Sequence, residues 1–245
     1  MNSDAPSMLI VQDTAPTAAG ALPLWLITEA TLPGWLAEQP ADVAAWVRAN
    51  GFQAEKQRVL MLPGLSGKLG GAVAGLGALA SLGELKLWHA AGLSDRLAPA
   101  TYRLATPLPA AAATQFTLGW LTGAYRFTRY RAPPAAGRAT LVAPAQADTT
   151  YTDAAASAMA LARDLVNTPA NDLGPAELAD VAAALAKRFG ATLKVTVGDE
   201  LKASRFPLIH AVGAGSPRQP RLIDLRWGKP GGLRGHAGRK RRVLR

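Results

Sequence analysis

Short apolar runs alternate with amphipathic stretches over residues 1–145, and this alternation restricts the possible folds more than any other feature. Apolar runs of four to six residues, each followed by a breaker, are typical of buried strands. The predicted strands are Pro23–Thr28, Arg58–Pro63, Tyr102–Ala105 and Ala139–Ala143. The predicted helices are Ala41–Asn50, Glu84–Ala91 and a helix that contains Phe116 and ends near Tyr130. Gly71–Ala78 is compatible with strand or loop. This order of elements predicts an α/β layered fold.

A second run of elements follows the polar segment 144–152, which we interpret as a linker. Asp153–Val166 has helical periodicity, with Met159, Ala162 and Val166 on one stripe beside Ala158, Leu161 and Leu165, and Pro169 ends it. Pro175 suits the first turn of another helix, whose predicted C-cap is Gly190. The predicted buried stripe of that helix is Leu178, Val181, Ala182, Leu185 and Phe189. The last predicted strands are Leu193–Val197 and Pro220–Trp227.

The composition excludes several kinds of site. The chain of 245 residues has no cysteine and three histidines, so disulfide scaffolds, cysteine zinc sites and thiol nucleophiles are excluded. HExxH, GxSxG and clustered carboxylates do not occur in it. Asp153, Asp164, Glu177 and Asp180 fall on predicted helices at positions that we expect to be solvated. The apolar run Leu69–Gly83 is too short to span a bilayer, and no signal peptide is evident, so we expect a cytoplasmic protein without a membrane partner.

Three local patterns have an ordinary structural explanation that we prefer. Gly75–Ala80 has the spacing of a dinucleotide fingerprint, but a tight turn packed against a neighbour is the better interpretation. Tyr125–Arg131 interleaves aromatics with arginines, as a single-strand nucleic-acid site would, yet a helix end with solvated arginines is favoured. His210, in an apolar segment, is interpreted as a hydrogen-bonded core residue.

Most of the excess positive charge lies at the C-terminus. The net charge is +10, from 27 basic and 17 acidic residues. Residues 229–245 carry seven of the basic residues and no acid, so the remainder has 20 − 17 = +3. A basic tail could contact phosphates and bind nucleic acid, which is the alternative function that we consider. The tail has few apolar residues to offset its ordering entropy, so we predict that it is disordered.

The segment from Ala162 to Trp227 resembles the leucyl (cytosol) aminopeptidase family. The resemblance rests on three stretches, Ala162–Pro175, Phe206–Gly213 and Pro220–Leu225, and most specifically on the spacing of Asn167, Pro169, Asn171 and Pro175. Upstream, the sequence is similar to the end of that family's N-terminal domain at Leu118–Trp120, Tyr125–Phe127 and Tyr130. The resemblance implies a macro-domain-like α/β domain over residues 1–145, a linker at 146–152 and an incomplete α/β catalytic domain over 153–228.

The resemblance also implies an activity. Members of the family are exopeptidases that release N-terminal residues from peptides. They use two divalent metal ions, manganese or zinc, which activate water and polarise the scissile carbonyl. They form homo-hexamers, an assembly that relies on the catalytic domain, so the oligomeric state of this chain is open. The family's metal ligands begin at a Val-Gly-Lys-Gly-x-x-Phe-Asp motif, which should follow Trp227 by ten to fifteen residues. No catalytic, cofactor-binding or metal-binding residue of this chain matches the family's ligand motifs.

Codons that are permitted for the basic tail encode the expected motif when the reading frame is shifted. One permitted set of codons for His236 to Arg245, shifted by one base, encodes Thr-Leu-Val-Gly-Lys-Gly-Val-Cys-Phe. We therefore interpret residues 229–245 as a frameshifted, non-native tail. The leading hypothesis is a truncated aminopeptidase that binds no metal and is inactive. A third hypothesis is that residues 1–145 act alone as a ligand or partner module.

Overall fold

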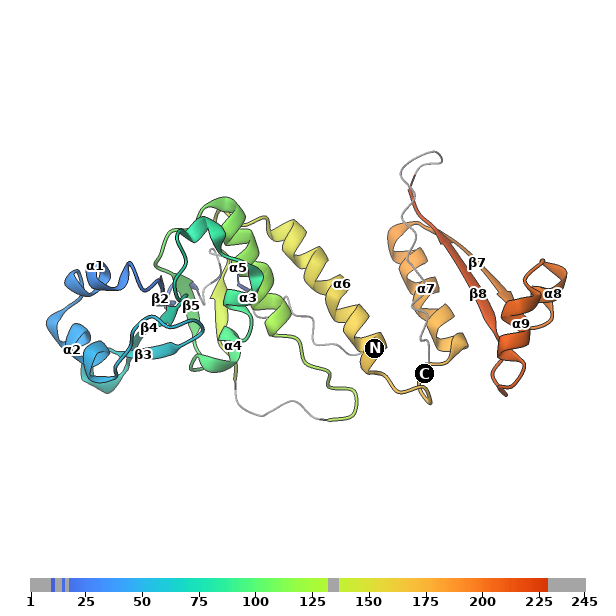
Figure 1. The fold of residues 1–245 in the computed structure, drawn as a ribbon, viewed down its shortest axis with the longest axis horizontal. Coiled ribbons are helices and arrows are strands. Elements are labelled where there is room, and N and C mark those ends of the chain that lie inside the picture. Colours follow the sequence, from blue (N-terminus) through green and yellow to red (C-terminus); the bar gives the residue numbers. More distant parts are fainter. Residues whose placement is uncertain (1–9, 12–14, 16–17, 132–136, 229–245) are drawn as a thin grey trace. The chain divides into compact units, whose positions relative to one another are not determined.

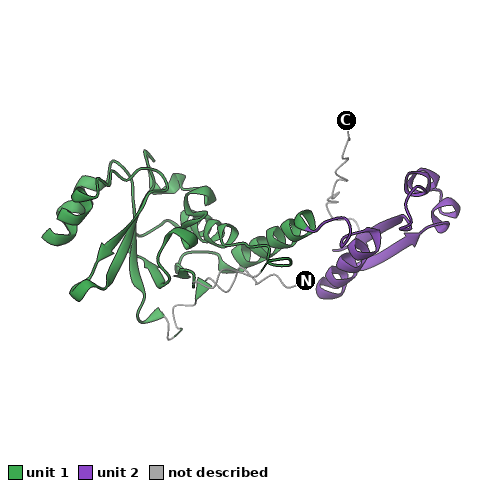
Figure 2. Cartoon of the chain, turned by 90° about the horizontal axis from the view of Figure 1, so that it is seen from below, with its two compact units in different colours: residues 1–167 green, residues 168–245 purple. Residues whose placement is uncertain are grey.

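The computed structural model describes residues 10–11, 15, 18–131 and 137–228. The contacts divide the chain into two compact units, Met1–Asn167 and Thr168–Arg245, which Figure 2 colours separately. Within the described ranges, no helix combines the length and apolar character that a bilayer crossing requires. The predicted disorder of residues 229–245 concerns a segment outside the described residues.

Unit 1 is built on a six-stranded sheet in the order β1-β6-β5-β2-β4-β3. All neighbouring strands are parallel except β3 and β4, which are antiparallel. The strands are β1 (Ile10–Val11), β2 (Leu22–Ile27), β3 (Val59–Pro63), β4 (Leu69–Gly75), β5 (Thr101–Leu104) and β6 (Thr140–Val142). The predicted α/β fold is confirmed, and the ambiguous segment Gly71–Ala78 is resolved in favour of strand β4, which extends to Gly75.

Helices cover both faces of this sheet (Figure 1). They are α1 (Leu32–Ala37), α2 (Ala41–Ala49), α3 (Leu87–Ala90), α4 (Leu93–Arg96), α5 (Ala110–Gly123) and α6 (Thr149–Asn167), with 3₁₀ turns η3 (Leu65–Gly67) and η4 (Leu82–Glu84). Alternate residues of β2 serve the two layers, because successive side chains of a strand point to opposite faces. Leu24 and Leu26 join one cluster, whereas Ile27 joins the other with Val47 of α2.

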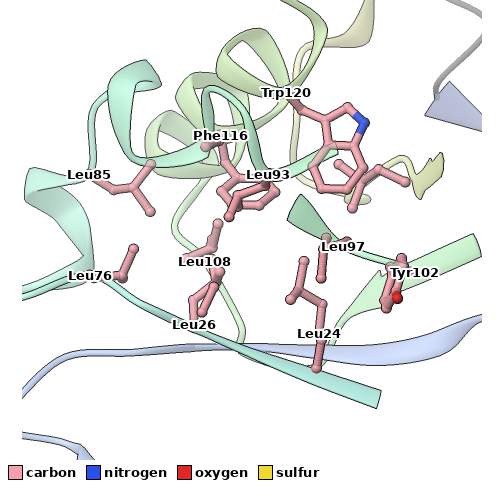
Figure 3. Packing of buried hydrophobic residues seen from close by; sticks show 14 of the residues in the cluster. Leu24, Leu26, Leu76, Leu85, Leu93, Leu97, Tyr102, Leu108, Phe116 and Trp120 are labelled. Atoms are coloured by element: carbon pink, nitrogen blue, oxygen red, sulfur yellow. The ribbon is translucent and has the colours of Figure 1, made fainter. Parts of the chain in front are cut away.

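The larger core lies between the sheet and α5. Figure 3 shows Leu26 of the sheet beside Leu108, and Leu24 beside Leu97, below the helix that carries Phe116 and Trp120. The two aromatic rings of α5 are 6.3 Å apart and fully buried. Burial of side chains of this size contributes about 1.5–3 kcal/mol each, so α5 is the main apolar anchor of unit 1.

Helix α6 differs from the prediction in its start and in its buried face. It begins at Thr149, not Asp153, because Asp148 Oδ1 accepts a hydrogen bond from the Tyr151 amide at 2.9 Å and thereby caps the helix. The predicted linker 146–152 is therefore partly helical. The buried residues of α6 are spaced by four: Thr152, Ala156, Ala160 and Asp164. The predicted apolar stripe is wrong, since Met159 and Val166 are exposed.

Helix α5 ends at Gly123, several residues before the predicted end near Tyr130. Two arginines from other segments bind carbonyls of its last turn. Arg138 donates to Ala124 O at 2.6 Å, and Arg163 donates to Thr122 O at 2.6 Å. These contacts satisfy carbonyl groups that a helix end leaves without intrahelical partners. The predicted helix Glu84–Ala91 is likewise shorter, with its start in the turn η4 and its end in α3.

Unit 2 contains α7 (Pro175–Phe189), β7 (Thr192–Val197), α8 (Glu200–Ala203), α9 (Pro207–Gly213) and β8 (Arg221–Arg226). Strands β7 and β8 form an antiparallel pair. Gly190 has φ +64° and caps α7, which confirms the predicted helix and its end. The predicted buried stripe of α7 is only partly covered, because Leu178 and Phe189 are exposed.

The predicted domain division at residue 145 stays a prediction. The compact units divide later, at Asn167, because α6 packs on α5 through Ala156 against Leu118 and Leu121.

Candidate functional site

The three stretches that carry the family pattern lie at the end of α6, in the loop that follows it, and in α9 and β8. Residues of the first stretch meet Tyr125, which follows α5. The Tyr125 hydroxyl donates to Asp164 Oδ1 at 2.7 Å and accepts from Asn167 Nδ2 at 3.2 Å. Arg163 lies over the Tyr125 ring at 5.2 Å. These contacts fix the end of α6 to Tyr125, so these residues have a structural role.

Asp164 is buried, which corrects the expectation that it is solvated. It belongs to the row of α6 that faces α5, and its carboxylate accepts the tyrosine hydroxyl. Burial and the hydrogen bond to Asp164 raise the pKa of Tyr125. A buried carboxylate already bound by a phenol is poorly placed to bind a metal ion, which would have to displace that hydrogen bond.

The loop between the units is held by Arg218. Its guanidinium donates to Ala170 O at 2.8 Å and to Asn171 O at 2.5 Å. Gly174, at the end of the loop, has no side chain, and a Cβ there would lie 2.9 Å from Arg218 Cδ. Glu177 Oε2 accepts from the Gly174 amide at 2.8 Å, as in a capping box. The Asn-x-Pro-x-Asn-x-x-x-Pro spacing therefore builds a fixed turn ahead of α7.

Three acidic side chains of unit 2, Glu177, Asp199 and Asp224, have basic or backbone partners. Glu177 has a lowered pKa because its own amide and that of Gly174 donate to it. Asp199 has a lowered pKa because of Lys202, and His210 Nε2 lies 3.2 Å from Asp199 Oδ1. Asp224 has a lowered pKa because of Arg226, at 2.7 Å. His210 is thus a partly buried residue of α9 beside Asp199, and it belongs to none of the hydrophobic clusters of the described chain.

The described residues do not fit a pair of metal ions. Ions such as Mn²⁺ need several oxygen or nitrogen donors that converge within about 2–2.6 Å. Among the described residues, no group of three or more His, Asp or Glu side chains converges in this way. A hollow of about 450 Å³ on unit 2 has one acid, Asp224, but it is also lined by Lys194, Arg205 and Arg226. Cationic walls would repel a divalent cation.

The other patterns noted in the sequence have structural roles. β4 ends at Gly75, and Gly77, at φ +72°, donates its amide to Ala54 O at 2.8 Å. This is the predicted tight turn packed against a neighbour. The segment Tyr125–Arg131 lies beyond α5 and is not helical, which corrects the predicted helix end. Arg126 in this segment pairs with Asp95.

Comparison with known proteins matches both parts of the chain. Residues 22–144 match the family model of the N-terminal domain of M17 aminopeptidases. Residues 160–237 match that of the catalytic domain of the cytosol aminopeptidase family. A probable cytosol aminopeptidase of Leifsonia xyli subsp. xyli is 36% identical over 195 residues, which are 75% of this chain and 39% of that protein.

Solved structures of two enzymes are also similar to this chain. The crystal structure of the cytosol aminopeptidase from Coxiella burnetii is similar with a TM-score of 0.79 and 29% identity, over 91% of this chain and 47% of that one. The bottromycin maturation enzyme BotP in complex with Mn is similar with a TM-score of 0.65 and 29% identity, over 85% and 45% of the two chains. The chain thus spans less than half the length of these relatives.

Proposed function

Because the chain belongs to the cytosol aminopeptidase family, M17, we propose that it is the N-terminal domain and the beginning of the catalytic domain of a metal-dependent aminopeptidase. The observation that carries the proposal is the ordered match of residues 22–144 and 160–237 to the two domains of that family. The parent enzyme would release N-terminal residues from peptides in the cytosol, where its relatives are named to act. Manganese or zinc would be its metal; one related structure is a complex with Mn.

We further propose that the chain as printed has no aminopeptidase activity. The acids of its catalytic portion support this, because Asp164, Glu177, Asp199 and Asp224 are each engaged by a protein partner. The metal-binding motif of the family is expected after Trp227, and in this account it is encoded in the frame shifted by one base.

Two measurements test the proposal. The first is the nucleotide sequence around codons 228–245: the shifted frame should continue into the metal-binding motif and beyond. The second uses the chain with its frame restored at about codon 236, where the shifted motif begins, assayed on leucine anilide before and after removal of metal by a chelator. We expect turnover that disappears with the metal and returns with manganese or zinc. A shifted frame that soon stops, or a restored chain without turnover, would refute the proposal.

A further inference from the structure

Strand β3 is the last strand at one edge of the six-stranded sheet of unit 1. Within the described chain, β3 pairs with β4 on one side and with no strand on the other. The unpaired side of an edge strand offers backbone donors and acceptors to any strand that approaches, including the same strand of a second copy. Whether this edge is open or closed therefore decides whether unit 1 can associate through its sheet.

The hydrogen-bond pattern identifies the groups of β3 that face away from the sheet. The Gly75 amide donates to Arg58 O at 2.8 Å, so the carbonyl of Arg58 faces β4. In an antiparallel strand, the backbone groups of successive residues point alternately toward and away from the partner strand. Leu60, opposite Val73, therefore faces β4, whereas Val59 and Met61 direct their amide and carbonyl groups outward.

Two features shorten the open part of this edge. Gln57 and Arg58 both hydrogen-bond to the single residue Gly75, so a bulge precedes β3. Gln57 has φ +66°, and such a bulge bends and twists the strand that contains it. At the other end, Pro63 has no amide hydrogen to donate. The outward amides of β3 are therefore those within Val59–Met61.

The indole of Trp46 covers the remaining part of the edge. Helix α2 lies against β3 (Figure 1), and Trp46 Nε1 donates to Met61 O at 3.0 Å. Trp46 is 45% exposed and belongs to none of the hydrophobic clusters of the described chain, unlike Val47 beside it. The hydrogen bond of Trp46 is thus made to the strand edge, outside the core that α2 covers.

A second copy of β3 would fit this edge if the indole were absent. Two β3 strands can pair antiparallel about Leu60 of each copy, which sets Val59 opposite Met61 of the other copy. Each such pair exchanges an N–H···O bond in both directions, so the two pairs together make about four hydrogen bonds. Half of these bonds are accepted by Met61 O, which is the atom that the Trp46 indole already binds.

We infer that Trp46 closes the β3 edge against strand addition and so keeps unit 1 from pairing, edge to edge, with a second copy of this chain. A strand that approached β3 would have to displace the indole from Met61 O before it could form its full set of hydrogen bonds. The inference does not depend on the proposed peptidase activity, because every residue that it uses lies in unit 1 and none is assigned to the chemistry.

The test replaces Trp46 in the full chain and measures self-association by sedimentation velocity. Trp46→Ala uncovers the edge, whereas Trp46→Phe keeps a ring there but has no N–H to donate. We expect Trp46→Ala to raise the self-association constant about tenfold or more over the wild type, since hydrogen bonds at Met61 O become available, and Trp46→Phe to raise it by less. Trp88→Ala is the matched control, because Trp88 is an exposed tryptophan of unit 1 that lies on α3. It should not raise the constant.

Hydrogen exchange locates the contact. In Trp46→Ala, the amides of Val59 and Met61 should become protected as the protein concentration rises. In the wild type, their exchange should not depend on concentration. Addition of Val59→Pro to Trp46→Ala should return association to the wild-type level, because proline removes an outward donor and is tolerated as the first residue of an edge strand.

The outcomes decide the inference. Folded Trp46 variants that associate no more than the wild type would overturn it. Equal association of Trp88→Ala, protection in β8 in place of β3, or association that persists in the double variant would overturn it as well. If circular dichroism shows that Trp46→Ala is unfolded, Trp46→Phe decides: stronger association with protection at Met61 supports the inference, and unchanged association refutes it.

Discussion

At the scale of single residues, Gly119 marks a close approach between α5 and α3. A Cβ at this position would lie against the carbonyl of Leu87 and 3.0 Å from Ala90 Cβ. Because backbone atoms cannot move aside as a side-chain end can, we expect Gly119→Ala to lower the free energy of unfolding by about 1–3 kcal/mol. Urea denaturation of the full chain measures this.

Gly34 is the matched control for that substitution. It lies in α1, and a Cβ there would meet no atom within 4 Å. Gly34→Ala should leave the stability unchanged or raise it by about 0.4–1 kcal/mol, because alanine restricts the unfolded chain. Equal losses for the two variants would show that the close approach at Gly119 is not present in solution.

The Tyr125 phenol should make stability depend on pH in the alkaline range. Burial and the hydrogen bond to Asp164 raise its pKa in the folded state, whereas the unfolded phenol ionises near pH 10, about its ordinary pKa. The contribution of the phenol to stability is therefore complete below that pH. It is lost as the pH rises through the folded-state pKa.

Tyr125→Phe tests this directly. The variant should be less stable by about 1–2 kcal/mol near neutral pH, since it loses the hydrogen bonds with Asp164 and Asn167. It should also lose less stability than the wild type as the pH rises above about 10, through the folded-state pKa of Tyr125. Burial also raises the pKa of Tyr102, but this residue is present in both proteins, so its contribution to the pH dependence of stability is common to them. Parallel pH profiles would contradict the assignment.

At the scale of elements, sequence patterns located the strands better than the buried faces of helices. Apolar runs such as Arg58–Pro63 correspond closely to β3, because alternate side chains of this strand pack against the apolar clusters on the two faces of the sheet. The buried face of helix α6 was not predicted correctly. Its contact with α5 uses small residues, Ala156 and Ala160, which permit close approach, and leaves the larger Val166 exposed. A pattern based on hydrophobic size selects the wrong stripe when the partner helix is unknown.

The sequence predicted part of the candidate site. The spacing of Asn167, Pro169, Asn171 and Pro175 identified the family segment, and the structure makes it a turn held by Arg218. The part played by Arg218 was not predictable, because it lies far along the chain and no local pattern links it to the loop. Burial of Asp164 was missed for the same reason: its partner, Tyr125, is 39 residues away.

The packing of α6 predicts which N-terminal fragment folds well. A fragment ending at residue 167 keeps Ala156 over Leu118 and Leu121, whereas one ending at 145 uncovers both leucines. We expect the shorter fragment to be less stable by about 2–4 kcal/mol, the cost of exposing part of two leucine side chains. Denaturant unfolding of the two fragments decides this. Equal stability would favour residues 1–145 as an independent domain, as the sequence predicted.

At the scale of the whole molecule, the two units differ in how far their described residues bury apolar side chains. Unit 1 has a six-stranded sheet and apolar cores on both faces. Unit 2 has one strand pair and exposed apolar residues such as Val212 and Trp227. We therefore expect purified chain to aggregate more readily than a fragment ending at residue 167. Light scattering at matched concentrations would measure this, and equal behaviour would show that the exposed apolar residues of unit 2 do not drive association.

The most direct test of the central claim is hydrolysis of leucine anilide by the purified chain as printed, with manganese or zinc added. We predict no turnover above a buffer blank and no stoichiometric binding of manganese by calorimetry, because the His, Asp and Glu side chains of the described residues do not converge in groups of three or more, and Asp164, Asp199 and Asp224 are engaged by protein partners. Metal-dependent turnover well above the blank would contradict it.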